Sequence, residues 1–409
     1  MLNKIHSFQD KKISQLIANI AFYLALAIEI LIVIVDKSSL INPFEGRLFQ
    51  ITFLLCLIKV VLTKYDIREY IVIFLFCLFG LWIDQAADRN EILRMIMFVS
   101  ALKGLDIRRA LKVVFWGTLA GSLGIILLSI TGIYGDITVA KEYAGGVFET
   151  TYAFGMGNAN SFHCMFFALV LLGIYIYEKN MKWWGYTCLV VGDVLLYMFT
   201  ASKTATAMSA LAVIAMAVTK YLKIGSASKN VGGKLSRWTL KIASGLCFVV
   251  YIFSIGFSLF MAKEAWKIYE YKWSRLTETH YLNQLIKLDN MLTGRMSTLM
   301  NKDNRAGSMG SWNWFPVRNH EEFFDLGYVR LFYWYGIIPA IIILVVIAVL
   351  IIYLFKKQKY TEIVFLTLIL AYTVLEAHFV SEYIGRCYPL LIMGMCWKKE
   401  SQLDMNLPF

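Results

Sequence analysis

One polar segment of the chain holds the two side chains best suited to chemistry, a histidine and an arginine. His320 lies in the run RNHEEFFDLG, which leads directly into an apolar stretch. Histidine takes up a proton near neutral pH, so His320 is a candidate general base that Glu321, Glu322 or Asp325 could orient. Arg295, in the run LTGR of the same segment, offers a permanent charge and a two-pronged donor for phosphate. The alternative for both residues is an ordinary position in a charged surface loop.

Two asparagines mark the start of a different apolar stretch. The run GMGNANS contains Asn158 and Asn160, and His163 follows three residues later. Carboxamides at a helix N-terminus cap the helix and can also bind ligand hydroxyls, and the glycines allow the backbone a close approach. A capped return into the membrane and a ligand site are both open readings of this motif. His163 is interpreted as a buried histidine with satisfied hydrogen bonds.

A lysine occupies the tight turn between two further apolar stretches. Lys203 lies in the run TASKTAT. It either extends its ammonium group to the membrane surface or binds a phosphate in a partly dry site. Asp193, in the preceding apolar stretch, is a candidate partner for this charge because acidic groups inside membranes rarely remain unpaired.

The composition predicts an integral membrane protein. Of 409 residues, 59% are hydrophobic, which is more apolar surface than one soluble core could bury. The net charge of +12 comes from basic residues that gather between the apolar runs, which indicates membrane orientation rather than nucleic-acid binding. The seven cysteines lie in apolar runs without a CxxC motif, so no disulfide or zinc framework is expected. Walker A, GxSxG, HExxH and DxD motifs are missing from the sequence, and no metal or other cofactor is expected.

The predicted fold is all-α, a polytopic transmembrane bundle of about 12 spans that forms a single domain over residues 1–409. Basic residues cluster in alternate connections, and the positive-inside rule then places both termini in the cytoplasm. One large extracytoplasmic loop, residues 262–326, is inserted between spans, and Trp266, Tyr269 and Trp273 predict an interfacial helix at its start. A smaller outer segment covers residues 134–159. The twelve apolar stretches are 13–35, 47–63, 70–83, 91–102, 113–133, 160–177, 183–199, 204–221, 242–261, 328–355, 363–379 and 385–397.

Taken together, these motifs resemble the O-antigen polymerase and ligase superfamily, which contains the Wzy-type polysaccharide polymerases and the O-antigen ligases. The resemblance covers about residues 150–395, and the stretches before it match in hydropathy only. Lys203 stands where relatives usually have arginine, and Glu321 where many have asparagine. The motifs are G-x-x-N-x-N from Gly155 to Asn160, S-[RK]-T-A at 202–205, the GR pair at 294–295, and H-x-x-F-x-x-x-G from His320 to Gly327.

The resemblance implies a GT-C-like glycosyltransferase that acts on the outer face of the bacterial cytoplasmic membrane. Such an enzyme transfers a glycan from an undecaprenyl-diphosphate carrier to an acceptor sugar hydroxyl without a metal. By the same resemblance, His320 would deprotonate the acceptor and Arg295 would bind the diphosphate. Further substrate contacts are assigned to Lys203, Arg318, Asn158 and Asn160. Other outer arginines that could replace Arg295 in contacting phosphate are Arg275, Arg305, Arg318 and Arg386.

The leading hypothesis is a polymerase of lipid-linked oligosaccharide repeat units for a surface polysaccharide such as capsule or O-antigen. Its partners would be the lipid-linked donor and acceptor and the membrane lipid, and whether a further protein sets the chain length stays open. The ligase activity is the close alternative. The Ile- and Lys-rich composition is typical of a low-GC genome, where lipopolysaccharide is less expected, and this favours the polymerase. A transporter or flippase of lipid-linked sugars is the alternative from another class, for which Glu29, Arg94 and Asp193 are the candidate ionisable residues deep in the spans. For Arg94 the other reading is an interfacial pair with Glu91, one turn away.

Overall fold

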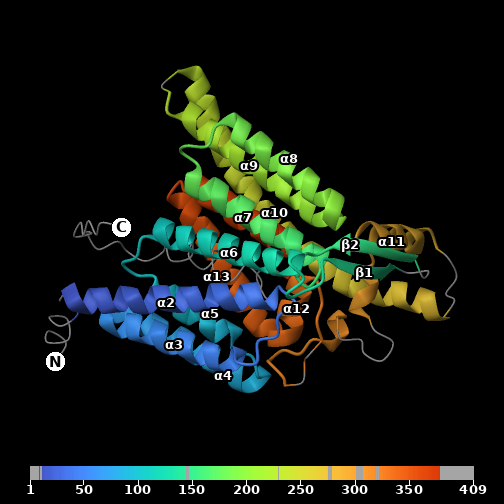
Figure 1. Ribbon diagram of the computed structural model, residues 1–409, viewed down its shortest axis with the longest axis horizontal. Helices are drawn as coiled ribbons and strands as arrows, with labels where there is room; N and C mark the ends of the chain where they lie inside the picture. The colour runs from blue at the N-terminus through green and yellow to red at the C-terminus, as the bar shows by residue number, and fades with distance from the viewer. Residues whose placement is uncertain are drawn as a thin grey trace. The chain divides into compact units, whose positions relative to one another are not determined.

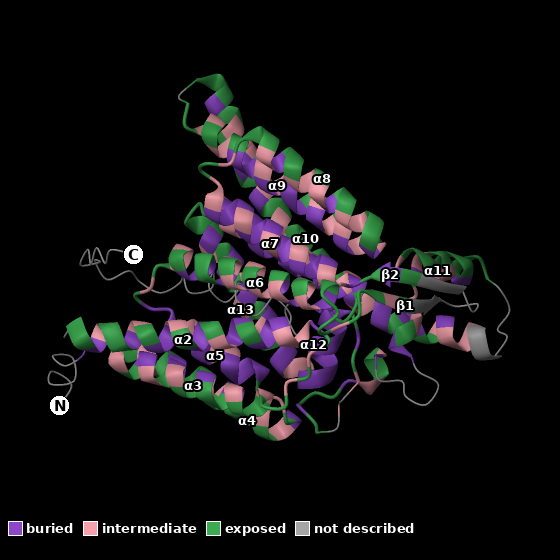
Figure 2. Cartoon of the chain, viewed as in Figure 1, coloured by how far each residue is buried: buried purple, intermediate pink, exposed green. Residues whose placement is uncertain are grey.

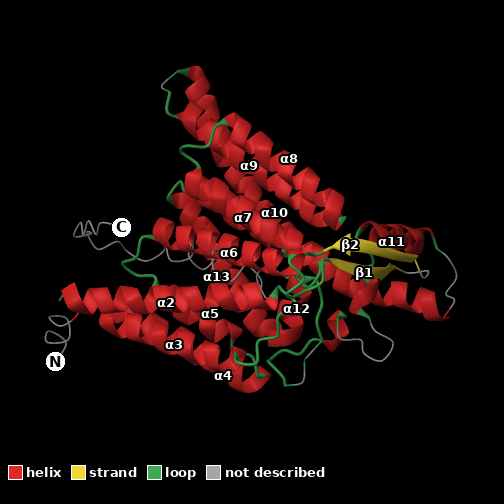
Figure 3. Ribbon diagram, in the orientation of Figure 1, coloured by secondary structure: helices red, strands yellow, loops and turns green. Residues whose placement is uncertain are grey.

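The computed structural model describes residue 9 and residues 12–143, 147–228, 230–274, 279–300, 307–318, 320 and 322–377. These residues form thirteen α-helices and one β-hairpin (Figures 1 and 3). Seven of the described helices are long and apolar enough to cross a membrane, so the prediction of a helical membrane-type protein is confirmed. The predicted stretch 385–397 and the end of 363–379 lie outside the described residues. The seven helices are α2 (Lys12–Asp36), α4 (Ile67–Ala87), α6 (Ile107–Ile130), α7 (Ala159–Tyr177), α9 (Lys203–Ser226), α10 (Val231–Ser274) and α13 (Ile337–Lys356).

These helices have exposed faces (Figure 2), and many of the exposed residues are large and apolar. On α10 they recur at helical spacing, so that they form one continuous stripe. Such a stripe would be unfavourable in water but is solvated by lipid tails. The exposed residues of the stripe are Leu235, Trp238, Ile242, Leu246, Val249 and Phe253.

The described residues fall into two compact units. The first takes its residues from Met1–Leu81 and Glu91–Ala217, and the second from Trp82–Asn90 and Val218–Arg386. In the first, α2 packs against α3 (Glu45–Leu62) and α6, and α7 packs between α6 and α8 (Trp183–Thr200). In the second, α10 contacts α11 (His280–Met291), α12 (Gly327–Tyr335), α13 and α14 (Tyr360–Tyr372).

A buried ion pair ties together helices of the first unit. Arg94, on α5 (Glu91–Ala101), places its Nε 3.1 Å from Oε1 of Glu29 on α2. The guanidinium also lies over the ring of Phe49, and Thr52 donates a hydrogen bond to the Glu29 carboxylate. The sequence had suggested Glu91 as the partner of Arg94, one turn away on the same helix. Glu29, on another helix, is a buried partner of Arg94, and a charge inside the unit gains from an equally buried opposite charge.

The smaller polar segment, residues 134–159, contains a β-hairpin that the hydropathy pattern did not predict. Strand β1 (Thr138–Tyr143) pairs antiparallel with β2 (Val147–Tyr152), with Thr138 opposite Tyr152 and Tyr143 opposite Val147. Both strands are rich in β-branched and aromatic residues, which favour extended structure. β2 leads into α7, with Asn158 as the N-cap of that helix and Asn160 in its first turn.

Helix α10 is far longer than the span predicted at 242–261. Its 44 residues extend about 66 Å, whereas the apolar core of a bilayer is about 30 Å thick. Residues after 261 therefore continue the same helix beyond the apolar run. Trp266 and Tyr269 lie on this extension, so the predicted interfacial helix is the end of a span and not a separate element.

The stretch 328–355, predicted as one span, is divided into α12 and α13 by Gly336. This glycine has φ +83°, and a Cβ there would lie 2.7 Å from the backbone of Phe315. The adjoining loop uses this space, since the carbonyls of Asn313 and Trp314 accept hydrogen bonds from the first amides of α13. Every residue of α12 is buried, so this short helix belongs to the interior of the second unit.

Replacing Gly327 by alanine should destabilise the second unit. Gly327 begins α12 and donates its amide proton to the carbonyl of Thr373, and a Cβ would lie 2.6 Å from the Thr373 side chain and 2.9 Å from Cα of Ala377. We expect Gly327→Ala to cost about 1–3 kcal/mol, seen as a lower melting temperature of the purified protein in detergent. Gly245→Ala on α10 is the control, because a Cβ there meets nothing within 4 Å. Equal melting temperatures for both variants would contradict this packing.

Candidate functional site

The backbone of α12 fixes the orientation of His320. Nδ1 of His320 lies 2.6 Å from the carbonyl oxygen of Tyr333, and the imidazole stacks on the Tyr333 ring at 4.1 Å between centroids. A carbonyl can only accept, so Nδ1 carries the proton and Nε2 of the neutral ring is the basic nitrogen. The amide nitrogen of Asn313 lies 3.3 Å from Nε2. A histidine held in this tautomer is equipped to accept a proton at Nε2.

The described contact that orients this ring is the carbonyl of Tyr333. Asp325 instead faces Arg295, with 3.6 Å between its Oδ2 and the arginine Nε. Glu322 contributes its backbone carbonyl to Nε1 of Trp334. Glu321 lies outside the described residues. The carbonyl of Tyr333 takes the orienting role because α12 packs directly beneath the connector that contains His320.

Two arginine contacts hold the backbone around His320 to the end of α4. Arg89 donates from Nη2 to the carbonyl oxygen of His320 at 2.9 Å, and its guanidinium stacks 3.6 Å above the ring of Trp334. Arg318, which is exposed, donates to the carbonyl of Gln85 at 3.1 Å. The sequence reasoning did not assign Arg89 a role. The only sequence signal for a role of Arg89 is its position as a basic residue directly after the C-terminal end of a span.

Arg295 is a buried arginine with two acidic neighbours. It is 8% exposed, and its Nη2 donates to the Glu376 carboxylate while its Nε faces Asp325. Nη1 donates to the hydroxyl of Thr293 at 3.1 Å. The permanent charge of Arg295 is therefore compensated within the unit, which differs from the exposed loop position considered from the sequence.

The turn after α11 places Arg295 in this position. Thr293 and Gly294 both adopt positive φ angles, which reverse the chain at the helix end. One carboxylate oxygen of Asp289, a buried residue, accepts hydrogen bonds from the amides of Met296 and Ser297. The glycine of the GR motif is thus a backbone requirement of the turn.

We define the loop cluster as His320, Arg318, Arg295, Asp325 and Glu376, all in the second unit. Within the described residues, no hydrogen bond or ion pair joins His320 directly to Arg295. They are connected through the chain segment from His320 to Asp325, whose far end faces Arg295. The arrangement provides an oriented base and an exposed cation on one segment, held in place by a buried charge pair.

A second group of predicted residues, the hairpin cluster, lies in the first unit and consists of Asn158, Asn160, Ser202 and Lys203. Asn158 caps α7 by accepting the amide proton of Ser161 at 2.7 Å, as the capping interpretation predicts. Asn160 accepts a 2.6 Å hydrogen bond from the hydroxyl of Ser202, so the N-terminal ends of α7 and α9 meet.

Lys203 is exposed and is the first residue of α9. Helix N-termini carry a partial positive charge, and a lysine at this position adds to that charge instead of compensating it. Two helix N-termini and an ammonium group therefore meet at the hairpin cluster. This combination favours an anionic group, such as a phosphate, as a ligand.

The predicted pairing of Asp193 with Lys203 is wrong, because Asp193 pairs with His163. Oδ1 of Asp193 lies 2.8 Å from Nε2 of His163, and Nδ1 of that ring lies 2.9 Å from the hydroxyl of Thr200. His163 is 0% and Asp193 1% exposed. His163 is therefore the buried, hydrogen-bonded histidine that the sequence indicated, and it stabilises the packing of α7 against α8.

Comparisons of the chain with protein-family models, with curated proteins and with solved structures give no match. Within the described residues, no three histidine, cysteine, aspartate or glutamate side chains gather into a set that could hold a metal ion.

Removing one partner of the His163–Asp193 pair should destabilise the first unit strongly. His163→Leu leaves the buried Asp193 carboxylate without its partner, which costs about 3–5 kcal/mol in comparable pairs. The double variant His163→Leu/Asp193→Leu removes both groups, and we expect it to be closer to the native protein. The measurement is the melting temperature in detergent. A double variant less stable than His163→Leu alone would contradict the pairing as the source of the loss.

Proposed function

We propose that this protein is a glycosyltransferase that polymerises lipid-linked oligosaccharide repeat units at the outer face of the bacterial cytoplasmic membrane. The observation that carries the proposal is His320, whose Nδ1 proton is held by the Tyr333 carbonyl so that Nε2 is the basic nitrogen. The likeness of the motifs to the O-antigen polymerase and ligase superfamily supplies the reaction class. A GT-C-type bundle of about twelve spans, with both termini in the cytoplasm, is part of this proposal.

The proposed reaction begins with proton removal from an acceptor sugar hydroxyl by Nε2 of His320. The hydroxyl oxygen forms a bond to the anomeric carbon of the donor glycan, and the bond from that carbon to the diphosphate breaks. Undecaprenyl diphosphate leaves with the electron pair, and His320 holds the proton until water removes it. Because the donor is already activated, the protein needs to supply orientation, proton removal and charge compensation.

Charge compensation for the diphosphate is assigned to exposed cations first. Arg318 is the exposed arginine of the loop cluster in the second unit, and it is the cation assigned to the diphosphate there. Lys203 is the exposed ammonium of the hairpin cluster in the first unit, and it is treated as a separate anion contact. The lysine ammonium is a point charge and lacks the two-pronged donor of arginine. Lys203 would therefore attract a phosphate without fixing its orientation. Asn158 and Asn160 order the backbone beside Lys203 through the cap and the Ser202 hydrogen bond.

Arg295 takes a more internal role than the resemblance alone implies. Its Glu376 partner is buried, whereas the side chain of Asp325 is 62% exposed and lies at the longer distance. A diphosphate offers a stronger two-oxygen acceptor than this exposed carboxylate. In the proposed cycle the diphosphate displaces Asp325, while Glu376 keeps the guanidinium in place.

The ionisable groups considered for a transporter are paired inside the first unit. Glu29 binds Arg94, and Asp193 binds His163. Such pairs are the expected way to accommodate charges within packed helices. They favour a structural role for these residues and leave the loop cluster as the place of chemistry.

Replacing His320 should abolish polymer formation. We expect His320→Ala, at normal membrane abundance, to lower the polymerisation rate by about 10²–10⁴-fold because general base catalysis is lost. Glycan length on gels would show single repeat units in place of long polymer. His280→Ala is the matched control, since His280 is an exposed histidine on α11 that contacts Gln284.

Full-length polymer that stays on its carrier in His320→Ala cells would point to the ligase activity. Unchanged polymer and attachment would refute the base assignment.

The charge at Lys203 should matter more than its shape. We expect Lys203→Ala to reduce polymer yield at limiting donor and Lys203→Arg to retain it, because arginine preserves the charge. Lys182→Ala, at the exposed N-terminal cap position of α8, is the control and should leave the yield unchanged. The measurement is repeat-unit incorporation against donor concentration in membrane vesicles. Equal donor dependence in Lys203→Ala and the native protein would show that Lys203 does not contribute to donor binding.

A further inference from the structure

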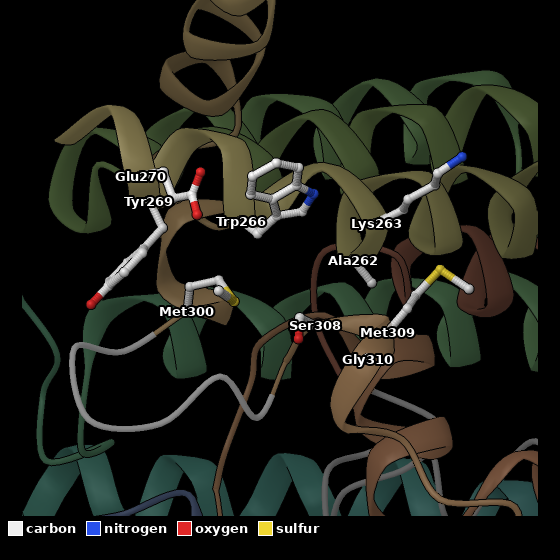
Figure 4. Close-up of a pocket in the computed structure, with 9 residues that line it drawn as sticks. All are labelled: Ala262, Lys263, Trp266, Tyr269, Glu270, Met300, Ser308, Met309 and Gly310. Carbon is white, nitrogen blue, oxygen red and sulfur yellow. The ribbon is translucent and has the colours of Figure 1, made fainter. Parts of the chain in front are cut away.

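A cavity of about 320 Å³ opens beside the C-terminal extension of α10 (Figure 4). One wall is the helix itself, and the opposite wall comes from the large loop in the same unit. The volume lies at the lower end of the range of about 300–1,000 Å³ that is typical of small-molecule sites. None of its lining residues belongs to the loop cluster. The described lining residues are Ala262, Lys263, Trp266, Tyr269, Glu270, Met300, Ser308, Met309 and Gly310.

The helix wall presents an aromatic face between two opposite charges. Trp266 is 42% exposed, with Lys263 three residues before it and Glu270 four residues after it, so all three lie along one helix face (Figure 4). Ser308 and Met309 stand on the opposite wall. The site thus combines a stacking surface with a cation, an anion and a hydroxyl group.

This chemistry fits a neutral sugar ring. One face of a hexose consists of C–H groups that pack on an indole, and its edge carries hydroxyls that both donate and accept. Glu270 can accept from such hydroxyls and Lys263 can donate to them. A phosphate group would be repelled by the Glu270 carboxylate as well as attracted by the Lys263 ammonium. A net charge on the ligand would therefore add little to its binding free energy.

The common alternative is that Trp266 anchors the helix among lipid headgroups. An anchor faces the bilayer with no protein opposite it. Here Met300 and the segment 308–310 line the same cavity as Trp266, on the wall across from α10. A tryptophan beside a cavity with protein on two sides is better suited to a soluble group than to a lipid surface.

We propose that this cavity is a binding subsite for an uncharged sugar unit, stacked on Trp266 and held at its edge by Lys263 and Glu270. Naming that sugar as part of the growing glycan rests on the proposed function, whereas the binding itself does not. A subsite separate from His320 would hold the chain by a unit that does not react.

Sugar binding can be measured by saturation-transfer NMR on the full chain in phosphatidylcholine nanodiscs. The probes are free glucose, galactose, mannose, rhamnose, N-acetylglucosamine and N-acetylgalactosamine. We expect signal transfer to at least one of them, weakened about tenfold in apparent affinity by Trp266→Ala, because stacking contributes up to about 1.5 kcal/mol. Glu270→Gln should weaken it less. Trp314→Ala is the matched control, since Trp314 is an exposed loop tryptophan that does not line the cavity.

Several results would overturn the inference. They are no transfer to any of the six sugars, equal transfer in Trp266→Ala, or full displacement of the sugar by glycerol 3-phosphate, which would identify a headgroup site. Glu270→Gln, which leaves the indole in place, tests the site if Trp266→Ala fails to fold. His320→Ala separates the two proposals, because it should bind the sugar as the native chain does. Binding that depends on Trp266, together with normal polymer in His320→Ala, would refute the proposed function alone.

Discussion

The hydrocarbon core of a bilayer contains no water to hydrogen-bond polar groups, so a polar group within a span needs a partner inside the protein. The helices satisfy their own backbones, and several buried side chains find partners in the same way. Arg94 binds Glu29, His163 binds Asp193, and the hydroxyl of Tyr251 donates to the carbonyl of Leu344. The hydroxyls of Ser254 and Ser258 on α10 donate hydrogen bonds to backbone carbonyls four residues earlier in the same helix. These internal pairings fix which helix faces meet, and the exposed faces are left to apolar side chains.

The same constraint explains why the candidate chemistry lies at the end of the spans. Helix α10 extends past its apolar run, and the large loop that follows returns through α12, which is buried over its full length. The break at Gly336 leaves space for the backbone of Phe315, and the rings of His320 and Phe324 pack against Tyr333 of α12. His320 thereby gains a backbone carbonyl as its fixed partner, and Arg295 holds the far end of the connector through Asp325.

Hydropathy in the sequence located most of the helices, because a run of apolar residues predicts a span without knowledge of its neighbours. The cap at Asn158 was also predictable, since capping involves only the next few residues. The partners of Arg94 and Asp193 were not predictable in this way, because each lies on another helix. The burial of Arg295 depends on Glu376, more than 80 residues later in the chain. The break at Gly336 was missed because a glycine within an apolar run leaves the mean hydropathy almost unchanged.

The central proposal is that the loop with His320 lies on the outer face of the membrane, where the proposed enzyme would join lipid-linked sugars. The most direct test is labelling of single cysteines in intact cells with a membrane-impermeant maleimide. Val317→Cys lies in the exposed loop, and Lys182→Cys lies in a connection expected to be cytoplasmic. The account predicts labelling at 317 in intact cells and at 182 only after permeabilisation. Labelling at 182 but not at 317 in intact cells would contradict it.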